Sequence, residues 1–278
     1  MAKREAPVRW PAHLLLIGCG NMAGAMLARW LDCGLPPACV TVIRPSGKPV
    51  ADGVTVRTAL SDPVAAGTVV VLGCKPQQLP AVSADLSGLI GAEATLLSIL
   101  AGVPVGRLRA AFGQAGAIVR CMPNLPVRIG RGVSTLHAEA EAPEAARALA
   151  SALCAPLGLV EWLEDEGLFD AATALAGCGP AFVYRFIDAL GAAGAQFGLD
   201  GAQAARMALA TVEGAAISAA AAEATPAAMA DAVASKGGMT RQGLDVLDRS
   251  DGLAALLIDT LRAARDRGAE LAALAVKD

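Results

Sequence analysis

A short apolar run that leads directly into a glycine-rich turn is the feature that most constrains the fold. Residues 14–17 are Leu-Leu-Leu-Ile, and residues 18–23 read Gly-Cys-Gly-Asn-Met-Ala before a helix-like stretch. In this pattern the first glycine allows a tight turn, the second lets the backbone approach a pyrophosphate, and the small alanine permits close packing of helix on strand. The alternative is a turn with a purely structural role. We expect a dinucleotide to contact Gly18, Gly20, Asn21, Met22 and Ala23.

Short apolar runs alternate with helix-length segments over the rest of the first half of the chain. They lie at residues 39–43, 69–72, 95–99 and 117–121, and each is bounded by Gly, Pro or Asp. Strands that are apolar along their whole length are typical of parallel sheets buried on both faces. The pattern therefore predicts a Rossmann-type, doubly wound α/β domain with a parallel sheet.

No strand pattern follows Glu161, and the second half of the chain is rich in Ala and Leu. Glycine and proline breakers divide it into expected helices at 168–199, 201–222, 226–234, 240–248 and 252–275. We expect an all-helical domain over residues 167–278 that follows a nucleotide-binding domain over residues 1–166.

Several of these helices are apolar nearly all round, with residues 202–222 as the clearest case. A domain of this size cannot bury so many apolar faces within itself, so we expect a partner subunit to cover them. The alternative is plain alanine enrichment. Gly191, Gly194 and Gly198 form a stripe of small residues that favours close helix packing. The sequence predicts a homodimer, or a higher homo-oligomer, through the C-terminal helices.

The charge balance excludes some classes of partner. The chain has 278 residues with 23 Lys+Arg and 26 Asp+Glu, a net charge of −3, and it contains no basic block. Nucleic-acid binding requires clustered cations, so we expect no nucleic-acid partner. The one uncharged run of membrane length, residues 10–28, contains a proline and three glycines, so we expect no membrane span.

Seven cysteines are spread along the chain without the spacing of a disulfide framework or a metal site. The only histidines are His13 and His137, so no metal is expected. Residues 16–19 resemble a lipoprotein cleavage site, but the apolar stretch before Cys19 is shorter than the ~7–15 residues that such a signal needs. We expect a cytoplasmic protein with reduced thiols.

The end of the second predicted strand distinguishes between dinucleotides. A fold that prefers NAD usually places Asp or Glu there, whereas residues 44–48 read Arg-Pro-Ser-Gly-Lys. Arg44, Ser46 and Lys48 suit a 2′-phosphate, which a carboxylate would repel. The residues favour NADPH, with NADH as the second choice. The alternative is a solvated loop with two incidental cations.

A strong general acid or base for hydride chemistry is missing from the sequence. Tyr184 lacks a lysine four residues on, His13 and His137 have no carboxylate partner in a motif, and Lys75 lacks a matching asparagine. An imine that arrives protonated needs only a hydride and a hydrogen-bonded nitrogen, so an imine substrate is favoured. Residues 235–240, Ser-Lys-Gly-Gly-Met-Thr before a helix, suit a carboxylate, although a glycine linker with an ordinary N-cap is an equal alternative.

The chain resembles the Δ1-pyrroline-5-carboxylate reductase family, whose members complete proline synthesis. Six stretches match in family order over nearly the whole chain, which is far more specific than the nucleotide turn alone. They are residues 17–23, 73–77, 101–103, 119–126, 170–182 and 235–240.

The resemblance implies an active site where the nicotinamide meets helices of both subunits. It places Cys74, Lys75, Pro76, Ala101, Gly102 and Asn124 against the cofactor. For the substrate, an imino acid, it implies contacts with Glu166, Ser235, Gly237, Gly238 and Thr240, and Thr240 would hydrogen-bond the ring nitrogen. Glu166 would favour the cationic iminium. Glu223 matches an acidic family position, with an exposed helix charge as the alternative.

The chain also departs from the family pattern. Hydroxyl or phenol groups are lost at Ala176, Cys178 and Phe182, and Lys236 and Met239 replace a proline and a threonine. These changes leave three alternatives to strict 1-pyrroline-5-carboxylate reduction: a related cyclic imino acid as substrate, a hydroxyacid-type dehydrogenase, and a catalytically silent NADPH-binding protein.

Overall fold

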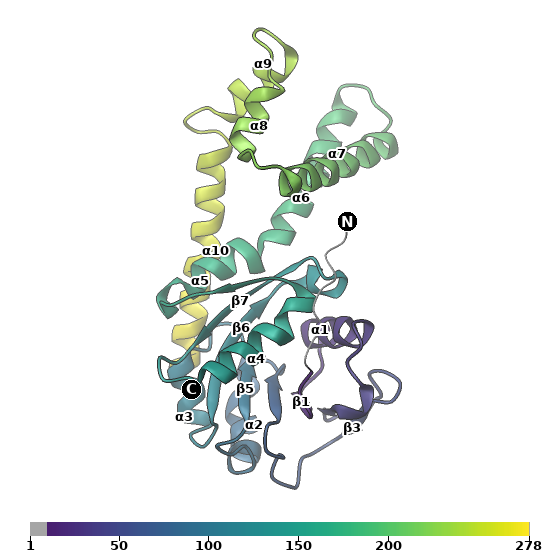
Figure 1. Ribbon diagram of the computed structural model, residues 1–278. Coiled ribbons are helices and arrows are strands. Elements are labelled where there is room, and N and C mark those ends of the chain that lie inside the picture. The colour runs from purple at the N-terminus through teal and green to yellow at the C-terminus, as the bar shows by residue number, and fades with distance from the viewer. Residues whose placement is uncertain (1–9, 278) are drawn as a thin grey trace. The chain divides into compact units, whose positions relative to one another are not determined.

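An eight-stranded sheet forms the centre of the first part of the chain (Figure 1). The computed structural model describes residues 10–277, with side chains up to residue 270. The strands lie side by side in the order β3-β2-β1-β4-β5-β6-β7-β8. Their bounds are β1 Leu14–Ile17, β2 Val40–Ile43, β3 Thr55–Arg57, β4 Val69–Leu72, β5 Thr95–Ser98, β6 Ala117–Pro123, β7 Gly132–Ala138 and β8 Gly158–Trp162.

Strands β1 to β6 are parallel, which confirms the predicted doubly wound arrangement and its five apolar strands. The sheet is not parallel throughout, because β7 runs antiparallel to β6 and β8 runs parallel to β7. Strands β3, β7 and β8 were not predicted from the sequence. Strand β3 has three residues, two of them exposed, and β7 buries the polar side chains of Ser134 and Thr135, so neither reads as an apolar run.

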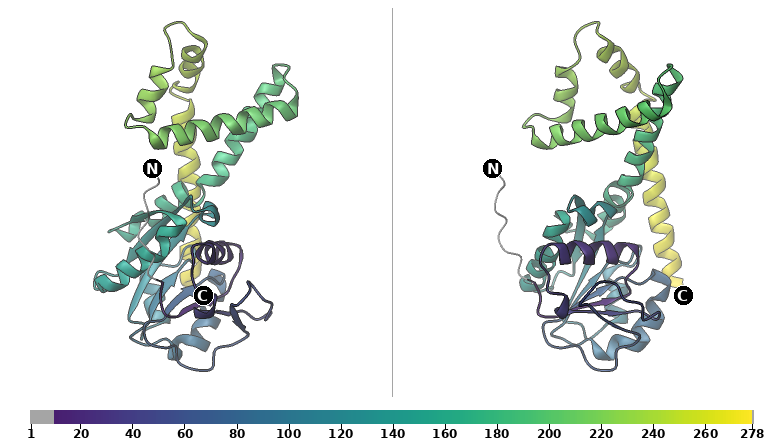
Figure 2. Two further views of the ribbon diagram at one scale, coloured as in Figure 1. Left: turned by 45° about the vertical axis from the view of Figure 1, so that its right-hand side comes forward. Right: turned by 90° about the vertical axis from the view of Figure 1, so that its right-hand side faces the viewer.

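Four helices cover the two faces of this sheet (Figure 2). Helices α1 (Asn21–Asp32) and α4 (Glu144–Cys154) pack on one face, and α2 (Leu79–Leu86) and α3 (Val105–Ala111) pack on the other. Successive residues of a strand point to opposite faces, so Leu14 and Leu16 face α1 whereas Leu15 and Ile17 face α2 and α3. Both faces are buried, as the apolar strands predict.

The Trp30 side chain ties the two helices of one face together. It is fully buried, and its Nε1–H donates to the carbonyl oxygen of Leu153 in α4 at 2.7 Å. Arg29 adds a parallel link, because its Nε donates to the carbonyl oxygen of Pro156 at 2.9 Å. The backbone of α4 and of the 3-10 turn that follows it thereby supplies acceptors to two side chains of α1.

The chain divides into two compact units. The first contains the sheet, the chain up to Cys178 and the end of the chain from Ala264, and the second is Gly179–Ala263. The compact units divide after Cys178, twelve residues beyond the predicted domain boundary at residue 166. The boundary between the two domains stays a prediction. The remaining helices are α5 Phe169–Ala172, α6 Gly179–Gln196, α7 Gly201–Ala221, α8 Pro226–Ala232, α9 Met239–Leu247 and α10 Leu253–Lys277. A π-helical turn at Thr173–Gly177 interrupts the helix expected at 168–199.

The second unit buries very little of its own surface. Helices α6 and α7 approach closely at Gly191, where an added Cβ would lie 3.2 Å from the Ala205 Cα. Within Gly179–Ala263 only Gly191, Ala204 and Ala208 are buried. Large apolar side chains are exposed on α6, α7, α9 and α10, among them Tyr184, Phe186, Met207, Ile217, Val246, Leu256 and Ile258. The unit therefore presents the uncovered apolar surface that the sequence predicts.

Across residues 10–277, no single helix is long and apolar enough to cross a membrane, while α7 and α8 pass the same length and composition test only as a pair bent by 116°.

We predict that Trp30→Phe destabilises the first unit. The change leaves the buried Leu153 carbonyl without its donor, which costs about 1–3 kcal/mol. Urea denaturation at fixed protein concentration measures the decrease in the free energy of unfolding. Trp162→Phe is the control, because Trp162 is half-buried and donates to the Ser151 hydroxyl, and water replaces it there. An equal decrease in unfolding free energy in the two variants would contradict a stabilising role for the hydrogen bond from Trp30 to Leu153.

Candidate dinucleotide and substrate sites

The turn after β1 has the geometry that only glycine permits. Gly18 has a φ of +83°, and an added Cβ would lie 3.0 Å from backbone atoms of Gly73 and Cys74. Its N–H donates to the Ile43 carbonyl oxygen at 2.8 Å, which links the ends of β1 and β2. A Cβ on Gly73 would meet the Ala23 Cβ at 2.8 Å. Helix α1 thus packs against β1 and β4 as closely as the predicted turn requires.

A pocket of about 810 Å³ opens at the carboxyl ends of β1, β2 and β4. Strands β1 and β4 lie side by side although β2 and β3 come between them in the chain, so this is the switch point where such sheets bind ligands. Gly18, Gly20, Arg44, Ser46, Cys74 and Lys75 line the pocket together. An added Cβ on Gly20 would meet no atom within 4 Å, so the space beside it is open to a phosphate.

The loop after β2 presents a cation and a hydroxyl to this pocket. The Arg44 N–H donates to the Arg57 carbonyl oxygen at 2.9 Å, which holds the loop against β3. The Ser46 hydroxyl accepts from the Lys48 N–H at 3.4 Å, but the Lys48 side chain does not line the pocket. The donor set fits a phosphate on the adenosine side of a dinucleotide.

Other predicted cofactor residues lie outside the pocket lining. Asn21, Met22 and Ala23 form the first turn of α1, and Pro76 follows Lys75. Asn124 is buried, and its side chain is committed inside the chain, since Nδ2 donates to the Ala176 carbonyl oxygen at 2.8 Å and Oδ1 accepts from the Val133 N–H at 2.9 Å. The side chain of Asn124 therefore holds the end of β6 in place, and its contact with a cofactor stays a prediction.

Two cysteines of this pocket are held as neutral thiols. Burial raises the pKa of the Cys74 thiol above its ordinary value, and it raises the pKa of Cys19 although the Arg44 charge acts in the opposite direction. Uncharged thiols suit a pocket that receives phosphates. In the part of the chain that the structure describes, no three His, Cys, Asp or Glu side chains gather to hold a metal.

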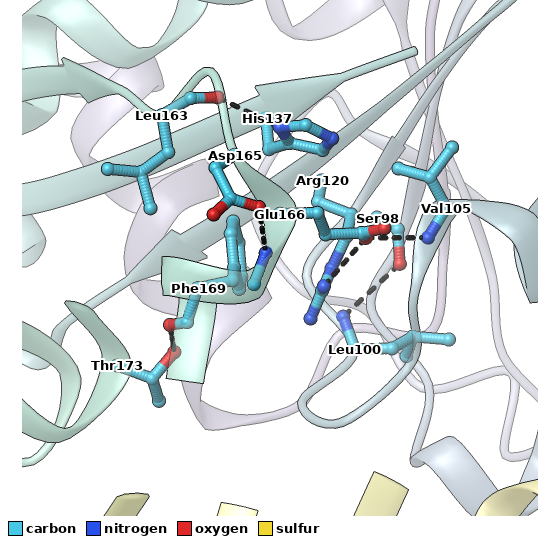
Figure 3. Close-up of polar contacts among 11 residues, drawn as sticks. Ser98, Leu100, Val105, Arg120, His137, Leu163, Asp165, Glu166, Phe169 and Thr173 are labelled. Atoms are coloured by element: carbon cyan, nitrogen blue, oxygen red, sulfur yellow. Dashed lines mark hydrogen bonds and ion pairs between the residues drawn. The ribbon is translucent and has the colours of Figure 1, made fainter. Parts of the chain in front are cut away.

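A smaller cavity of about 240 Å³ lies beside Glu166 in the same unit, and Gly102, Pro104, Arg120 and Asp170 also line it. One oxygen of Glu166, Oε1, accepts two hydrogen bonds of 2.8 Å, from Nη1 of Arg120 and from the N–H of Val105 (Figure 3). The structure therefore brings the predicted Glu166 and Gly102 together, and it adds Arg120.

Several residues that line the larger pocket were not predicted from the sequence. Thr58, Ala59 and Leu60 line the larger pocket directly after β3, and Gln78, Val82, Asp85 and Leu86 line it from the segment after β4. Finding β3 would have revealed the first group, because carboxyl ends of parallel strands meet at one edge. Arg120 carried a signal of its own, since a charge inside an apolar strand needs a partner.

The predicted carboxylate loop lies in the second unit. Gly237 has a φ of +72°, and the Gly238 N–H donates to the Ser235 carbonyl oxygen at 2.9 Å, which turns the chain into α9. Helix α9 begins at Met239, and no side chain caps its first turn. Ser235, Lys236 and Thr240 are exposed within the chain, as is Glu223 after α7. The loop therefore has free N–H groups and two hydroxyls at a helix start.

Comparison with known proteins assigns the chain. Residues 166–271 match the family model described as pyrroline-5-carboxylate reductase dimerisation, and residues 13–102 match the one described as NADP oxidoreductase, coenzyme F420-dependent. A pyrroline-5-carboxylate reductase of Pseudomonas aeruginosa is 35% identical over 265 residues, which cover 94% of this chain and 97% of that protein. The chain belongs to the pyrroline-5-carboxylate reductase family. Its predicted oxidoreductase class and nicotinamide-dinucleotide cofactor are thereby confirmed.

Solved structures agree with this family assignment. The pyrroline-5-carboxylate reductase of Coxiella burnetii is 29% identical with a TM-score of 0.82, and the match covers 94% of this chain and 99% of that one. The Plasmodium falciparum enzyme, solved with NADP bound, shares the fold at 23% identity and a TM-score of 0.81, covering 94% and 98% of the two chains. The family's dimerisation domain also supports homo-oligomerisation of this chain.

We predict that Gly20→Ala weakens dinucleotide binding about tenfold or more without lowering the melting temperature. The new methyl group has room in the fold but occupies the space beside the turn, where the backbone must approach a phosphate. Fluorescence titration with NADPH and a thermal melt measure the two effects. Gly24→Ala, four residues along α1, is the control and should bind normally. Normal NADPH affinity in the Gly20 variant would contradict this site.

Proposed function

We propose that the protein reduces 1-pyrroline-5-carboxylate to L-proline with NADPH. The single observation that supports this most is the large pocket at the β1–β4 switch point, with its glycine turn, Arg44 and Ser46, in a chain of the pyrroline-5-carboxylate reductase family. A protein of the same fold binds NADP. NADPH is preferred over NADH because the loop after β2 offers a cation and a hydroxyl where a carboxylate would hold the NAD ribose.

Different residues bind the phosphate groups and the nicotinamide half of the cofactor. Gly18, Gly20 and the start of α1 bind the pyrophosphate, and Arg44 with Ser46 binds the 2′-phosphate. Ala101 and Gly102 follow β5, the next strand beyond the switch point, and therefore flank the nicotinamide half. When bound, the reduced nicotinamide supplies the hydride that C5 of the cyclic iminium accepts.

The loop before α9 binds the substrate. The N–H of Gly237, the free N–H groups at the start of α9 and the hydroxyl of Ser235 hold its carboxylate. Gly238 contributes by shaping the turn, since its own N–H donates to the Ser235 carbonyl oxygen. The Thr240 hydroxyl oxygen accepts a hydrogen bond from the N–H of the iminium ring, and Thr240 does not act as a full acid because a hydroxyl is too weakly acidic to donate its proton unaided. A substrate that arrives as an iminium needs no stronger acid.

The exposed apolar helices of the second unit form the homodimer, and dimers are free to build larger assemblies through the same unit. The partner surface completes the burial that this unit lacks on its own. We place the protein in the cytoplasm, where its free thiols remain reduced.

A panel of substrates tests the proposed function. NADPH oxidation is followed with the five-membered imine 1-pyrroline-5-carboxylate, with a six-membered cyclic imino acid and with a 2-ketoacid, and the product is identified as proline by mass. We expect the five-membered imine to have the highest kcat/KM. A higher value for the six-membered ring would assign the related imino acid. Turnover of the ketoacid alone, or of none of the three, would refute the proposal.

We predict that Arg44→Ala raises the KM for NADPH about tenfold or more and leaves the KM for NADH unchanged. One charge-assisted hydrogen bond contributes about 1.5–3 kcal/mol, and only NADPH carries the 2′-phosphate. Steady-state kinetics with each nucleotide measure the ratio of the KM for NADPH to the KM for NADH. Lys48→Ala is the control, since Lys48 does not line the pocket, and its ratio should change less.

We predict that Thr240→Ala lowers kcat about tenfold to a hundredfold, because the charged ring N–H loses a hydrogen-bond acceptor worth about 1.5–3 kcal/mol. Thr240→Ser keeps the hydroxyl and should retain most of the activity. Both variants should bind NADPH normally, which fluorescence titration checks. An alanine variant with the turnover of the unmodified protein would remove Thr240 from the mechanism.

A further inference from the structure

Arg120 is a charged side chain in the middle of a buried strand. The residue is 5% exposed, and its guanidinium stacks on the Phe169 ring at 3.8 Å from the centroid. Nη1 donates to Glu166, while Nε is buried without a partner among the described residues. Such a charge is costly to bury unless its partner is held in a defined geometry. The interaction between Arg120 and Glu166 therefore fixes the carboxylate of Glu166.

Glu166 also contacts the start of helix α3. The same Oε1 that accepts from Arg120 also accepts from the N–H of Val105, the first residue of α3. An N–H in the first turn of a helix has no partner within the helix, so the carboxylate supplies the missing acceptor. Figure 3 shows Arg120 and Val105 converging on Glu166 from β6 and from the start of α3.

The segment between β5 and α3 is consequently held at both ends. At its start, the Ser98 hydroxyl accepts from the Leu100 N–H at 3.3 Å, and at its end Glu166 holds Val105. Between these points Leu100 and Val103 are buried, whereas Gly102 and Pro104 face the small cavity. The turn at residues 99–104 thus has little freedom to move.

We propose that Arg120 and Glu166 are a positioning pair that sets the turn at residues 99–104 against the nicotinamide half of the cofactor. This inference rests on the proposed function, which places Ala101 and Gly102 there. Glu166 acts through the Val105 N–H, and not by placing its charge on the substrate. The position of the turn therefore depends on whether an oxygen of residue 166 reaches the Val105 N–H, and much less on the negative charge of the carboxylate.

Two conservative variants separate reach from charge. Glu166→Gln keeps an oxygen at the same reach but loses the charge, and Glu166→Asp keeps the charge but is one methylene shorter. Glu164→Gln is the matched control, because Glu164 is an exposed carboxylate two residues away. Circular dichroism and a thermal melt establish that each variant is folded.

Amide hydrogen exchange of the protein without nucleotide is the first readout, because it does not depend on activity. We expect the Val105 amide and the peptide covering residues 99–105 to exchange at least tenfold faster in Glu166→Asp. Exchange in Glu166→Gln and Glu164→Gln should stay within threefold of the unmodified protein. Unchanged exchange in Glu166→Asp would overturn the proposal.

Steady-state kinetics with NADPH and 1-pyrroline-5-carboxylate are the second readout. We expect kcat to fall at least tenfold in Glu166→Asp and at most threefold in Glu166→Gln, with the Kd of NADPH within twofold in both. The opposite order, with a raised imine KM in Glu166→Gln, would show a direct charge on the substrate and overturn the proposal. If the unmodified protein does not reduce the imine, the proposed function fails, while the exchange result still decides whether Glu166 holds the turn.

Discussion

The close contact of Gly18, Gly73 and Ala23 is the constraint on which the first unit depends. No side chain fits at either glycine, because an added Cβ would collide with backbone or with the Ala23 methyl group. The contact lets α1 lie directly over the carboxyl ends of β1 and β4, and it thereby creates both the close-packed layer and the pocket at its edge. Fold and binding site arise here from one packing requirement.

The strands that the sequence predicts are those buried on both faces. Strands β1 and β4 are apolar throughout, β2 and β6 have one polar residue each, and β5 has two leucines and is followed directly by Ile99, so all five stand out against the polar segments around them. Strand β3 is short and mostly exposed, β8 alternates, and β7 buries Ser134 and Thr135. Such strands owe their conformation to pairing with a neighbour, which no local pattern records.

The candidate site divides in the same way. Backbone devices, such as the glycine turn after β1 and the loop before α9, can be predicted because their residue types have few other uses. Hydrogen-bond partners that lie far apart in the sequence cannot be predicted in this way. Asn124 meets Ala176, and Arg120 meets Glu166, only after β6 and the segment following β8 have come together. Glu166 was expected from the family resemblance, and its contact with the iminium stays a prediction, whereas its hydrogen bonds to Arg120 and Val105 follow only from the fold.

The last helix gives the molecule an unusual chain path. Helix α10 starts in the second unit at Leu253 and ends in the first, where Gly268 packs beside Asp170. The second unit is therefore an insertion with two covalent connections, near residues 178 and 263, and not an appendage. A truncated chain that stops at residue 178 would expose Asp170 and leave the nucleotide-binding unit unfinished. Limited proteolysis at one connection would, for the same reason, nick the protein without releasing either unit.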